Sequence, residues 1–383
     1  MKIGILTQSL RNNYGGLLQN YALQRVLFEA GHDPITFDQG PKNVSIIRKY
    51  LFYLKKYLLY KANPSKYSRP LCILNKKEEA IIRKNTLYFI NKYIKHTIVL
   101  KSLEEIEKES KVRKIEGFVV GSDQCWRASY NYHFPAMFLS FASNVKKIAY
   151  AASFGIDKWE LSEKATNAYR QWVKDFNLVT VREDSGVIVC KQSLGVDNAI
   201  HVLDPTMLLT KQNYIDLIMA ENEQKSEGEL FYYILDPSEV KSKFISKISN
   251  ETGYRSFIVL PKYKEEYCTY YNLKHNIEDC IYPSVTKWLR AFFDAKMVIV
   301  DSFHGTVFSI LFNKPFWVIL NDKRGNTRFT SLLTMFGLED RLVSENDLKS
   351  LNYNKPICWE RVNSILEEKR LFSTNLLLDT LKI

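Results

Sequence analysis

The segment from Met297 to Leu320, MVIVDSFHGTVFSILFNKPFWVIL, constrains the fold more than any other part of the chain. Its pattern predicts a short buried strand, a polar turn, an apolar helix and a second strand. Such a strand–turn–helix unit places the side chains of the turn at the carboxyl edge of a parallel sheet, beside the free amides of the helix N-terminus. Open α/β sheets bind their ligands at that edge. We therefore expect the functional site there.

The polar turn of this segment carries a titratable side chain. His304 opens the predicted helix, with Asp301 and Ser302 before it and the flexible Gly305 after it. A purely structural interpretation stays open, in which Asp301 or Ser302 caps the helix and His304 only fills its first turn. Otherwise, the imidazole ring of His304 faces a pocket that favours anions.

A group of cations follows the second strand of the segment. The loop NDKRGNTRF carries Lys323, Arg324 and Arg328 among glycine and asparagine residues. Guanidinium and ammonium groups are the usual protein partners of carboxylates and phosphates. Because this loop follows the neighbouring strand, the cations favour a role for His304 in binding or transforming an anionic ligand.

The N-terminal residues predict the start of a Rossmann-like arrangement. Lys2 to Thr7 is typical of a buried strand, Gly16 to Ala30 of a helix, and Ile35 to Phe37 of a second strand. The loop QSLRNNYGG after the first strand lacks G-x-G-x-x-G, so no dinucleotide fingerprint is present. Its candidate ligand contacts are Asn13, Tyr14 and Gly15, and a plain turn is the alternative interpretation.

Two other predicted strands end in charged residues. The strand GFVVGS leads into Asp123, and the strand LVTV leads into Arg182. Arg182 is a candidate anion ligand, although an ion pair with Asp184 or a neighbouring acid would also explain it. Asp123 is the best-placed carboxylate for a general base.

The order of the predicted elements indicates two Rossmann-like domains. A chain of 383 residues is long for a single domain. We expect the first domain at 1–215, with a helical insertion at 41–114, and the second at 216–358, carrying His304. The C-terminal helix at 359–383 is expected to pack back on the first domain.

The positive charge of the chain is concentrated in the insertion. Residues 41–114 hold 19 Lys and Arg against 6 Asp and Glu, whereas the other residues hold 35 against 36. No nucleic-acid-binding signature accompanies this charge, so we expect no nucleic-acid partner. Residues 44–60 place apolar and aromatic side chains on one helical stripe and cations on the rest. Core packing of an inserted arm is one interpretation, and contact with a membrane or a lipid carrier is the other.

Other features bear on location and metals. The sequence has no run of about 18 apolar residues and no leader-like start, which predicts a cytoplasmic protein, at most peripheral at the inner face of the membrane. Its six cysteines include no C-x-x-C pair, which argues against a zinc site and a disulfide framework.

Several motifs, taken in order, resemble the polysaccharide pyruvyl transferase family. They are KIGILT with NYGGLLQNYALQ, VVGSDQCW, YAASFG, VREDSG, VLDPTMLL, VDSFHGTVFSILFNKPF and RGNTRFTSLL, spread from residue 2 to about 340. Gly16 stands where the family commonly has alanine, and Arg127 where a small polar residue often follows the tryptophan. The insertion at 41–114 lies outside the matching blocks.

The resemblance implies two Rossmann-type domains facing a cleft, as in the GT-B architecture. It also implies transfer of the enolpyruvyl unit of phosphoenolpyruvate to sugar hydroxyls as a pyruvate ketal, with no metal or other cofactor. The acceptor would be a sugar or lipid-linked oligosaccharide of a surface polysaccharide. His304 would be catalytic and Arg182 would contact phosphoenolpyruvate, while Arg324, Arg328, Asp301 and Ser302 are further candidates.

Two other functions remain open from the sequence. A GT-B-like glycosyltransferase would bind a nucleotide sugar and ignore phosphoenolpyruvate. A non-catalytic glycan-binding relative would keep the fold and the cleft without turnover, although such a protein has no need to retain His304 and the arginines.

Overall fold

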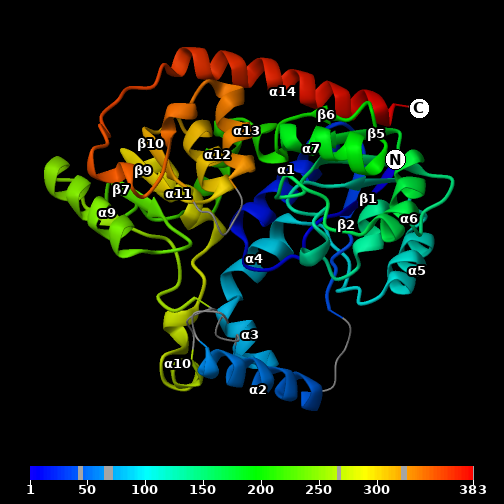
Figure 1. The fold of residues 1–383 in the computed structure, drawn as a ribbon, viewed down its shortest axis with the longest axis horizontal. Helices are drawn as coiled ribbons and strands as arrows, with labels where there is room; N and C mark the ends of the chain where they lie inside the picture. Colours follow the sequence, from blue (N-terminus) through cyan, green and yellow to red (C-terminus); the bar gives the residue numbers. More distant parts are fainter. Residues whose placement is uncertain (42–45, 64–71, 265–268, 321–325, 383) are drawn as a thin grey trace.

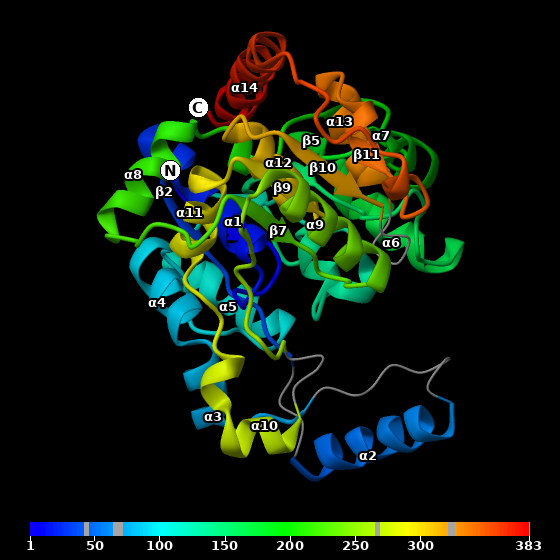
Figure 2. The same cartoon turned by 90° about the vertical axis from the view of Figure 1, so that its left-hand side faces the viewer.

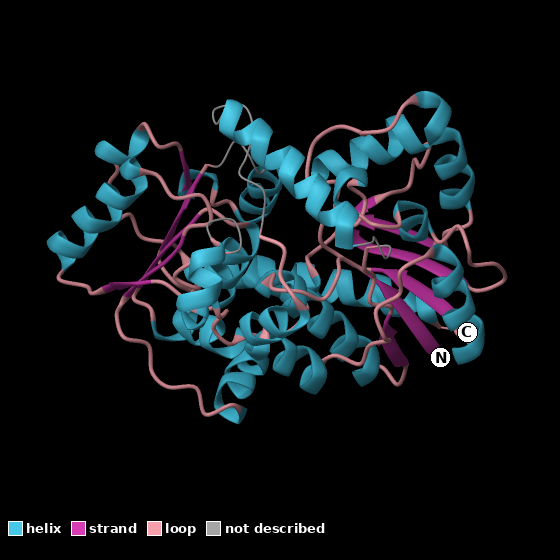
Figure 3. Cartoon of the chain, turned by 90° about the horizontal axis from the view of Figure 1, so that it is seen from below, coloured by secondary structure: helices cyan, strands magenta, loops and turns pink. Residues whose placement is uncertain are grey.

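The computed structural model describes residues 1–41, 46–63, 72–264, 269–320 and 326–382. Two separate sheets form the body, and all described strand pairs in both are parallel. Helices cover both faces of each sheet (Figure 3). This is the α/β architecture that the alternating sequence pattern predicts.

The first sheet has the strand order β2-β1-β3-β4-β5-β6. Its strands are β1 (Lys2–Leu6), β2 (Asp33–Thr36), β3 (Gly117–Val120), β4 (Lys146–Ala152), β5 (Leu178–Val181) and β6 (Ile200–His201). The central strands are buried on both faces, which is why they consist of continuous apolar runs.

The second sheet has the order β11-β10-β9-β7-β8. Its strands are β7 (Leu230–Tyr233), β8 (Ser256–Phe257), β9 (Met297–Val300), β10 (Phe316–Ile319) and β11 (Leu342–Val343). Strand β9 lies in the middle of this sheet and is completely buried. The turn that follows it therefore opens at the centre of the carboxyl edge.

The helices alternate with the strands. Those of the first half are α1 (Tyr14–Glu29), α2 (Ile46–Ala62), α3 (Lys76–Ile82), α4 (Lys84–Tyr93), α5 (Leu103–Arg113), α6 (Glu163–Lys174), α7 (Asp184–Val189) and α8 (Lys211–Ala220). Those of the second half are α9 (Glu239–Thr252), α10 (Tyr270–His275), α11 (Val285–Asp294), α12 (Phe303–Leu311), α13 (Thr327–Phe336) and α14 (Trp359–Leu381). Among the described residues, none of these helices is long and apolar enough to span a membrane.

The C-terminal helix α14 runs along one side of the molecule, past helices of both halves (Figure 1). Its Arg370 donates a hydrogen bond from Nε to the carbonyl of Met207 at 2.8 Å. Ser373 accepts a hydrogen bond from the backbone N–H of Leu203 at 3.2 Å. These contacts tie the end of the chain to the connection that leaves the first sheet.

The two halves meet through a buried aromatic cluster. The ring of Tyr14, at the start of α1, lies 5.7 Å from Trp288 of α11 and 6.5 Å from Tyr233 of β7. The Tyr14 hydroxyl donates a hydrogen bond to the carbonyl of Pro283 at 2.9 Å. The hydrophobic core is therefore continuous from one half to the other.

An arm made of α2, α3 and α10 projects from the body (Figures 1 and 2). The interpretation that the apolar stripe of α2 packs into a core is wrong, because Ile47 is 70% exposed and Leu51 61% exposed. Apolar spacing alone defines a helical face and says nothing about what covers it.

Two local features follow from helix capping. The helical pattern at 76–93 is divided into α3 and α4 at Arg83, which is the C-cap of the first helix and the N-cap of the second. Helix α8 begins after Thr210, which forms a capping box with Asn213.

The aromatic contact between the halves yields a stability prediction. Replacing the completely buried Trp288 by Ala removes its contacts with α1 and β7 and leaves a cavity. We expect the free energy of unfolding to fall by about 3–5 kcal/mol, measured by denaturant titration. The matched control is Phe28→Ala, because Phe28 is 70% exposed on α1. Equal effects of the two substitutions would contradict this role of Trp288.

Candidate active site

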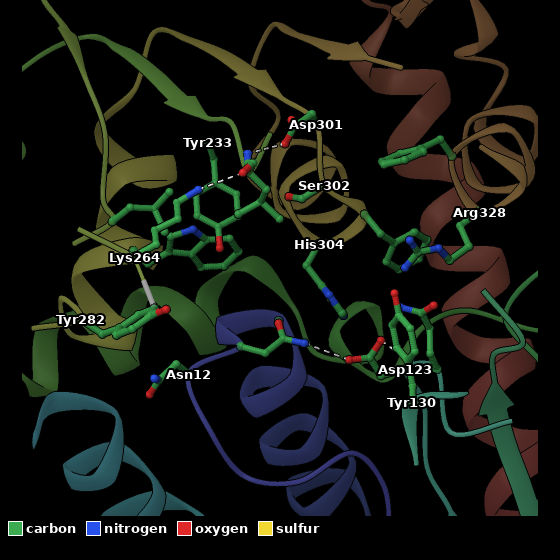
Figure 4. A pocket seen from close by; sticks show the side chains of 18 residues that line it. Asn12, Asp123, Tyr130, Tyr233, Lys264, Tyr282, Asp301, Ser302, His304 and Arg328 are labelled. Atoms are coloured by element: carbon green, nitrogen blue, oxygen red, sulfur yellow. Dashed lines mark hydrogen bonds between the residues drawn. The ribbon is translucent and has the colours of Figure 1, made fainter. Parts of the chain in front are cut away.

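A cavity of about 340 Å³ lies between the two halves, at the carboxyl ends of the strands of both sheets (Figure 4). Residues that follow β1, β3, β7, β8, β9 and β10 form most of its wall, and the segment at the start of α11 completes it. They include Asn12, Asn13, Gly15, Asp123, Gln124, Tyr130, Tyr233, Lys264, Tyr282, Asp301, Ser302, His304 and Arg328. The cavity therefore gathers most of the candidates that the sequence predicts.

His304 enters the cavity wall from the first turn of α12. Ser302 caps this helix by accepting a hydrogen bond from the N–H of Gly305 at 3.1 Å. The imidazole ring lies against α1 of the other half at Gly15, where a Cβ would fall 2.1 Å from Nδ1. Only glycine at position 15 leaves room for the ring.

A buried carboxylate, Asp204, stands behind the histidine. Its Oδ2 lies 3.5 Å from Nε2 of His304. It accepts hydrogen bonds from the Ser122 hydroxyl at 2.8 Å, from the Arg182 guanidinium at 3.0 Å, and from the Thr206 hydroxyl at 2.7 Å. Burial raises the pKa of Asp204, but the charge and hydrogen bond of His304, followed by the charge of Arg182 and the hydrogen bond from Thr206, hold it well below the ordinary value. The ionised Asp204 can orient the imidazole ring and stabilise a proton on it.

Arg182 lies behind the cavity wall and is not among the residues that line it. Its guanidinium pairs with Asp204 and lies 3.7 Å from both Asp123 and Glu183. The same group stacks over the ring of Phe303 at 4.1 Å. Of the two interpretations of Arg182, the structure places it in an ion pair with a neighbouring acid.

Asp123 faces the cavity from the first half. Its backbone is left-handed, with a φ of 68°, and this turn aims the carboxylate at the cavity. Its Oδ2 accepts a hydrogen bond from Asn13 Nδ2 at 3.0 Å, and its Oδ1 accepts one from the N–H of Gln124 at 2.9 Å. Figure 4 shows Asp123 and His304 pointing into the same space from opposite sides.

Arg328 is the described arginine of the cavity wall. It stands in the first turn of α13 and is almost completely buried. Burial and the nearby charge of Arg182 lower the pKa of Arg328 to about 10, so the group remains a cation at neutral pH. Arg324 and Lys323 lie outside the described residues.

Two of the candidates have structural partners. Asp301 is completely buried and accepts hydrogen bonds from the N–H of Leu235 at 2.6 Å and from Lys241 Nζ at 3.0 Å. It thereby shapes the loop after β7 that forms part of the wall. Tyr14 does not line the cavity, because its ring belongs to the aromatic cluster between the halves.

Two functional candidates escaped the sequence reasoning. Asp204 follows the short strand β6 just as Asp123 follows β3, so the position of a carboxylate after a strand could have identified it. Lys264 lines the cavity and donates a hydrogen bond to the carbonyl of Leu235 at 3.0 Å. It comes from a stretch without periodicity, which gave no signal. Among the described residues, no group of three or more His, Cys, Asp or Glu is arranged to hold a metal ion.

Solved structures of similar architecture identify the fold class of the chain. S. aureus MnaA, in a structure with UDP, has a TM-score of 0.51 at 11% identity, over 100% of this chain and 96% of that one. UDP-GlcNAc 2-epimerase from Methanocaldococcus jannaschii, in complex with UDP-GlcNAc and UDP, has a TM-score of 0.50 at 14% identity, over 100% and 99%. The chain is therefore an α/β protein of the GT-B fold.

The family is narrower than the fold. A model of the polysaccharide pyruvyl transferase family matches residues 13–323, most of the chain. The protein belongs to that family, as its motifs indicated. No curated protein matches the sequence.

The low pKa of Asp204 yields a prediction about stability and pH. Asp204→Asn leaves the buried Arg182 without its closest charged partner, and we expect a loss of about 3–5 kcal/mol at pH 7. Because the pKa of Asp204 is lower in the folded than in the unfolded protein, its contribution is complete above about pH 4 and is lost as the pH falls toward the folded-state pKa.

The measurement is denaturant unfolding of both proteins between pH 7 and pH 3. The difference in the free energy of unfolding between the wild type and Asp204→Asn should become smaller below about pH 4. The control is Asp197→Asn, since Asp197 has a side chain that is 79% exposed. A difference that stays constant with pH would show that Asp204 acts only through packing.

Proposed function

We propose that this protein is a ketal-forming pyruvyl transferase, which moves the enolpyruvyl group of phosphoenolpyruvate onto a sugar of a surface polysaccharide or glycan precursor. The observation that supports this most is His304, held at a helix N-terminus in the cavity with the ionised Asp204 behind it. Family membership supports the transferase class.

In the proposed reaction His304 delivers a proton to C3 of phosphoenolpyruvate, which becomes a methyl group and leaves C2 electrophilic. One sugar hydroxyl attacks C2 and gives its proton to Asp123. The bond from C2 to the phosphate oxygen then breaks and leaves an oxocarbenium ion, which the second hydroxyl captures. The proton of the second hydroxyl leaves with phosphate, and transfer of the proton from Asp123 to His304 restores both groups, so the reaction balances without a change in oxidation state.

The donor carries a carboxylate and a phosphate, and the wall offers groups that suit both. Arg328 and the amides that open α12 beside Ser302 are the described candidates. Arg324 and Lys323 are further candidates on the adjoining loop. We propose that Arg182 acts indirectly, by holding Asp204 behind His304, because its guanidinium is already surrounded by acids.

The acceptor is proposed to be a sugar or a lipid-linked oligosaccharide in the cytoplasm. Asn13 fixes the carboxylate of Asp123, and Tyr130 and Tyr282 add aromatic surface to the wall. Aromatic faces and carboxylates together suit the apolar and hydroxyl faces of a sugar ring.

The second candidate is a glycosyltransferase that uses a nucleotide sugar. It is favoured by the fold, which the chain shares with proteins solved with UDP and UDP-GlcNAc. A non-catalytic glycan-binding protein is a third candidate, and it would bind the acceptor without turnover.

Calorimetric titration with phosphoenolpyruvate, and with UDP-sugars as a comparison, separates these functions. We expect saturable phosphoenolpyruvate binding, weakened about 10- to 100-fold by Arg328→Ala through loss of a buried charged contact. Arg255→Ala is the control, because Arg255 is exposed and far from the cavity. Tight UDP-sugar binding without phosphoenolpyruvate binding would overturn the proposal in favour of the glycosyltransferase.

His304→Gln tests the proton donor. We expect phosphate release from phosphoenolpyruvate in the presence of acceptor to fall about 10²- to 10⁴-fold, because glutamine cannot deliver a proton. Phosphoenolpyruvate binding should change only a few-fold, which separates catalysis from binding. His32→Gln serves as the control, because His32 lies directly before β2 and does not line the cavity. Unchanged turnover in a folded His304→Gln protein would exclude His304 as the donor.

A further inference from the structure

Helix α2 exposes more large apolar surface than any other described element. Its exposed apolar and aromatic side chains are Ile47, Tyr50, Leu51, Phe52, Leu54, Leu58 and Leu59. Five of them recur at helical spacing and form one stripe, which we call the α2 stripe: Ile47, Tyr50, Leu51, Leu54 and Leu58. A contiguous exposed apolar stripe on a projecting helix indicates a surface that binds a membrane or another molecule.

The attachment of α2 to the body uses a different set of side chains. Tyr53 and Tyr57 are half-buried and stack on each other at 6.1 Å. Tyr53 also contacts the ring of Tyr270 on α10 edge-on at 5.8 Å. Tyr53 thus holds α2 against α10, whereas the side chains of the α2 stripe stay half or more exposed among the residues that the structure describes.

The charged residues of α2 itself are all Lys or Arg. Residues 41–75 contain eight Lys and Arg and no Asp or Glu. Lys56 lies over the Phe52 ring at 4.7 Å, and Lys61 lies over the Tyr57 ring at 5.8 Å. In both contacts the ammonium nitrogen lies over an aromatic ring while the lysine itself stays exposed, so cations and aromatic side chains occur together on this helix, as they do in helices at a membrane surface.

This charge selects among the surfaces that could cover α2. Pairing two copies of the chain through their stripes would bring two groups of cations together, which is unfavourable. An anionic surface is complementary to them. We propose that α2 is a membrane-docking helix that lies in the headgroup region of an anionic bilayer, with the α2 stripe at the acyl boundary and cations such as Lys55 and Lys56 at the lipid phosphates.

The base of the arm is bonded to the wall of the active-site cavity. Arg83 donates a hydrogen bond to the carbonyl of Leu10 at 2.7 Å, and Asn85 donates one to the carbonyl of Tyr282 at 2.8 Å. The N–H of Tyr282 in turn bonds to the carbonyl of Ile82 at 3.0 Å. Docking through α2 therefore holds the cavity in a defined position above the bilayer.

Co-sedimentation of the full chain with lipid vesicles tests the proposal. We expect binding to vesicles of phosphatidylcholine mixed with phosphatidylglycerol, and weaker binding to phosphatidylcholine alone. Leu54→Glu combined with Leu58→Glu removes part of the stripe, and Lys55→Gln combined with Lys56→Gln removes two charges. Each pair should weaken binding about tenfold or more, and added salt should weaken the wild type.

Two matched controls lie outside the arm. Val112→Glu changes an apolar side chain that is 69% exposed on α5, and Lys243→Gln removes an exposed charge from α9. Both should bind vesicles like the wild type. Thermal unfolding checks that all variants fold, since the substituted side chains are exposed.

Absence of wild-type binding to both vesicle types, or equal binding by the arm variants and the wild type, would overturn the proposal. A second contradicting result combines two observations: the wild type does not bind vesicles, and it forms a dimer in analytical ultracentrifugation that the leucine substitutions dissociate. That result would identify a second copy of the chain as the partner of the α2 stripe. The assay contains no phosphoenolpyruvate, so its failure is distinct from failure of the proposed reaction.

Discussion

The buried carboxylate of Asp204 is the interaction on which the site depends. A buried charge is costly unless cations and hydrogen bonds compensate it. Asp204 obtains that compensation from Ser122 after β3, from Arg182 after β5 and from Thr206 in its own turn. His304 approaches from the other half of the chain. The same group therefore organises the strand ends of the first sheet and joins them to the helix that starts at the centre of the second.

Three consecutive residues make the junction between the halves. Asn13 caps α1 and binds the carboxylate of Asp123, Tyr14 enters the aromatic cluster, and Gly15 leaves space for the ring of His304. Each position needs a different side chain: an amide at 13, a large aromatic ring at 14 and no side chain at 15. One turn of the chain therefore contributes both to the interface between the two halves and to the wall of the cavity.

Much of the architecture follows from the sequence, because parallel strands buried on both faces give apolar runs and polar residues mark their ends. That rule identified His304 and Asp123. It could not show that Arg182 points at Asp204 instead of the cavity, since the two lie 22 residues apart and their pairing depends on how neighbouring strands stack. Likewise, the stripe of α2 was visible as a helical face, but only three-dimensional packing shows that its side chains stay exposed among the described residues.

The pairing of acids also shows how the proposed anionic donor would be compatible with several carboxylates in one site. Asp204 is compensated by Arg182, and Asp301 by Lys241, each at 3.0 Å. Asp123 accepts hydrogen bonds and lies 3.7 Å from the guanidinium of Arg182. Because these cations stand behind the wall, they neutralise the repulsion that the carboxylates would exert on a phosphate. The acids can then orient a histidine and accept a proton while Arg328 still gives the cavity a positive charge. The proposed anion chemistry at this edge of the sheets thus depends on the buried arginine and lysine behind the wall, which compensate its acids.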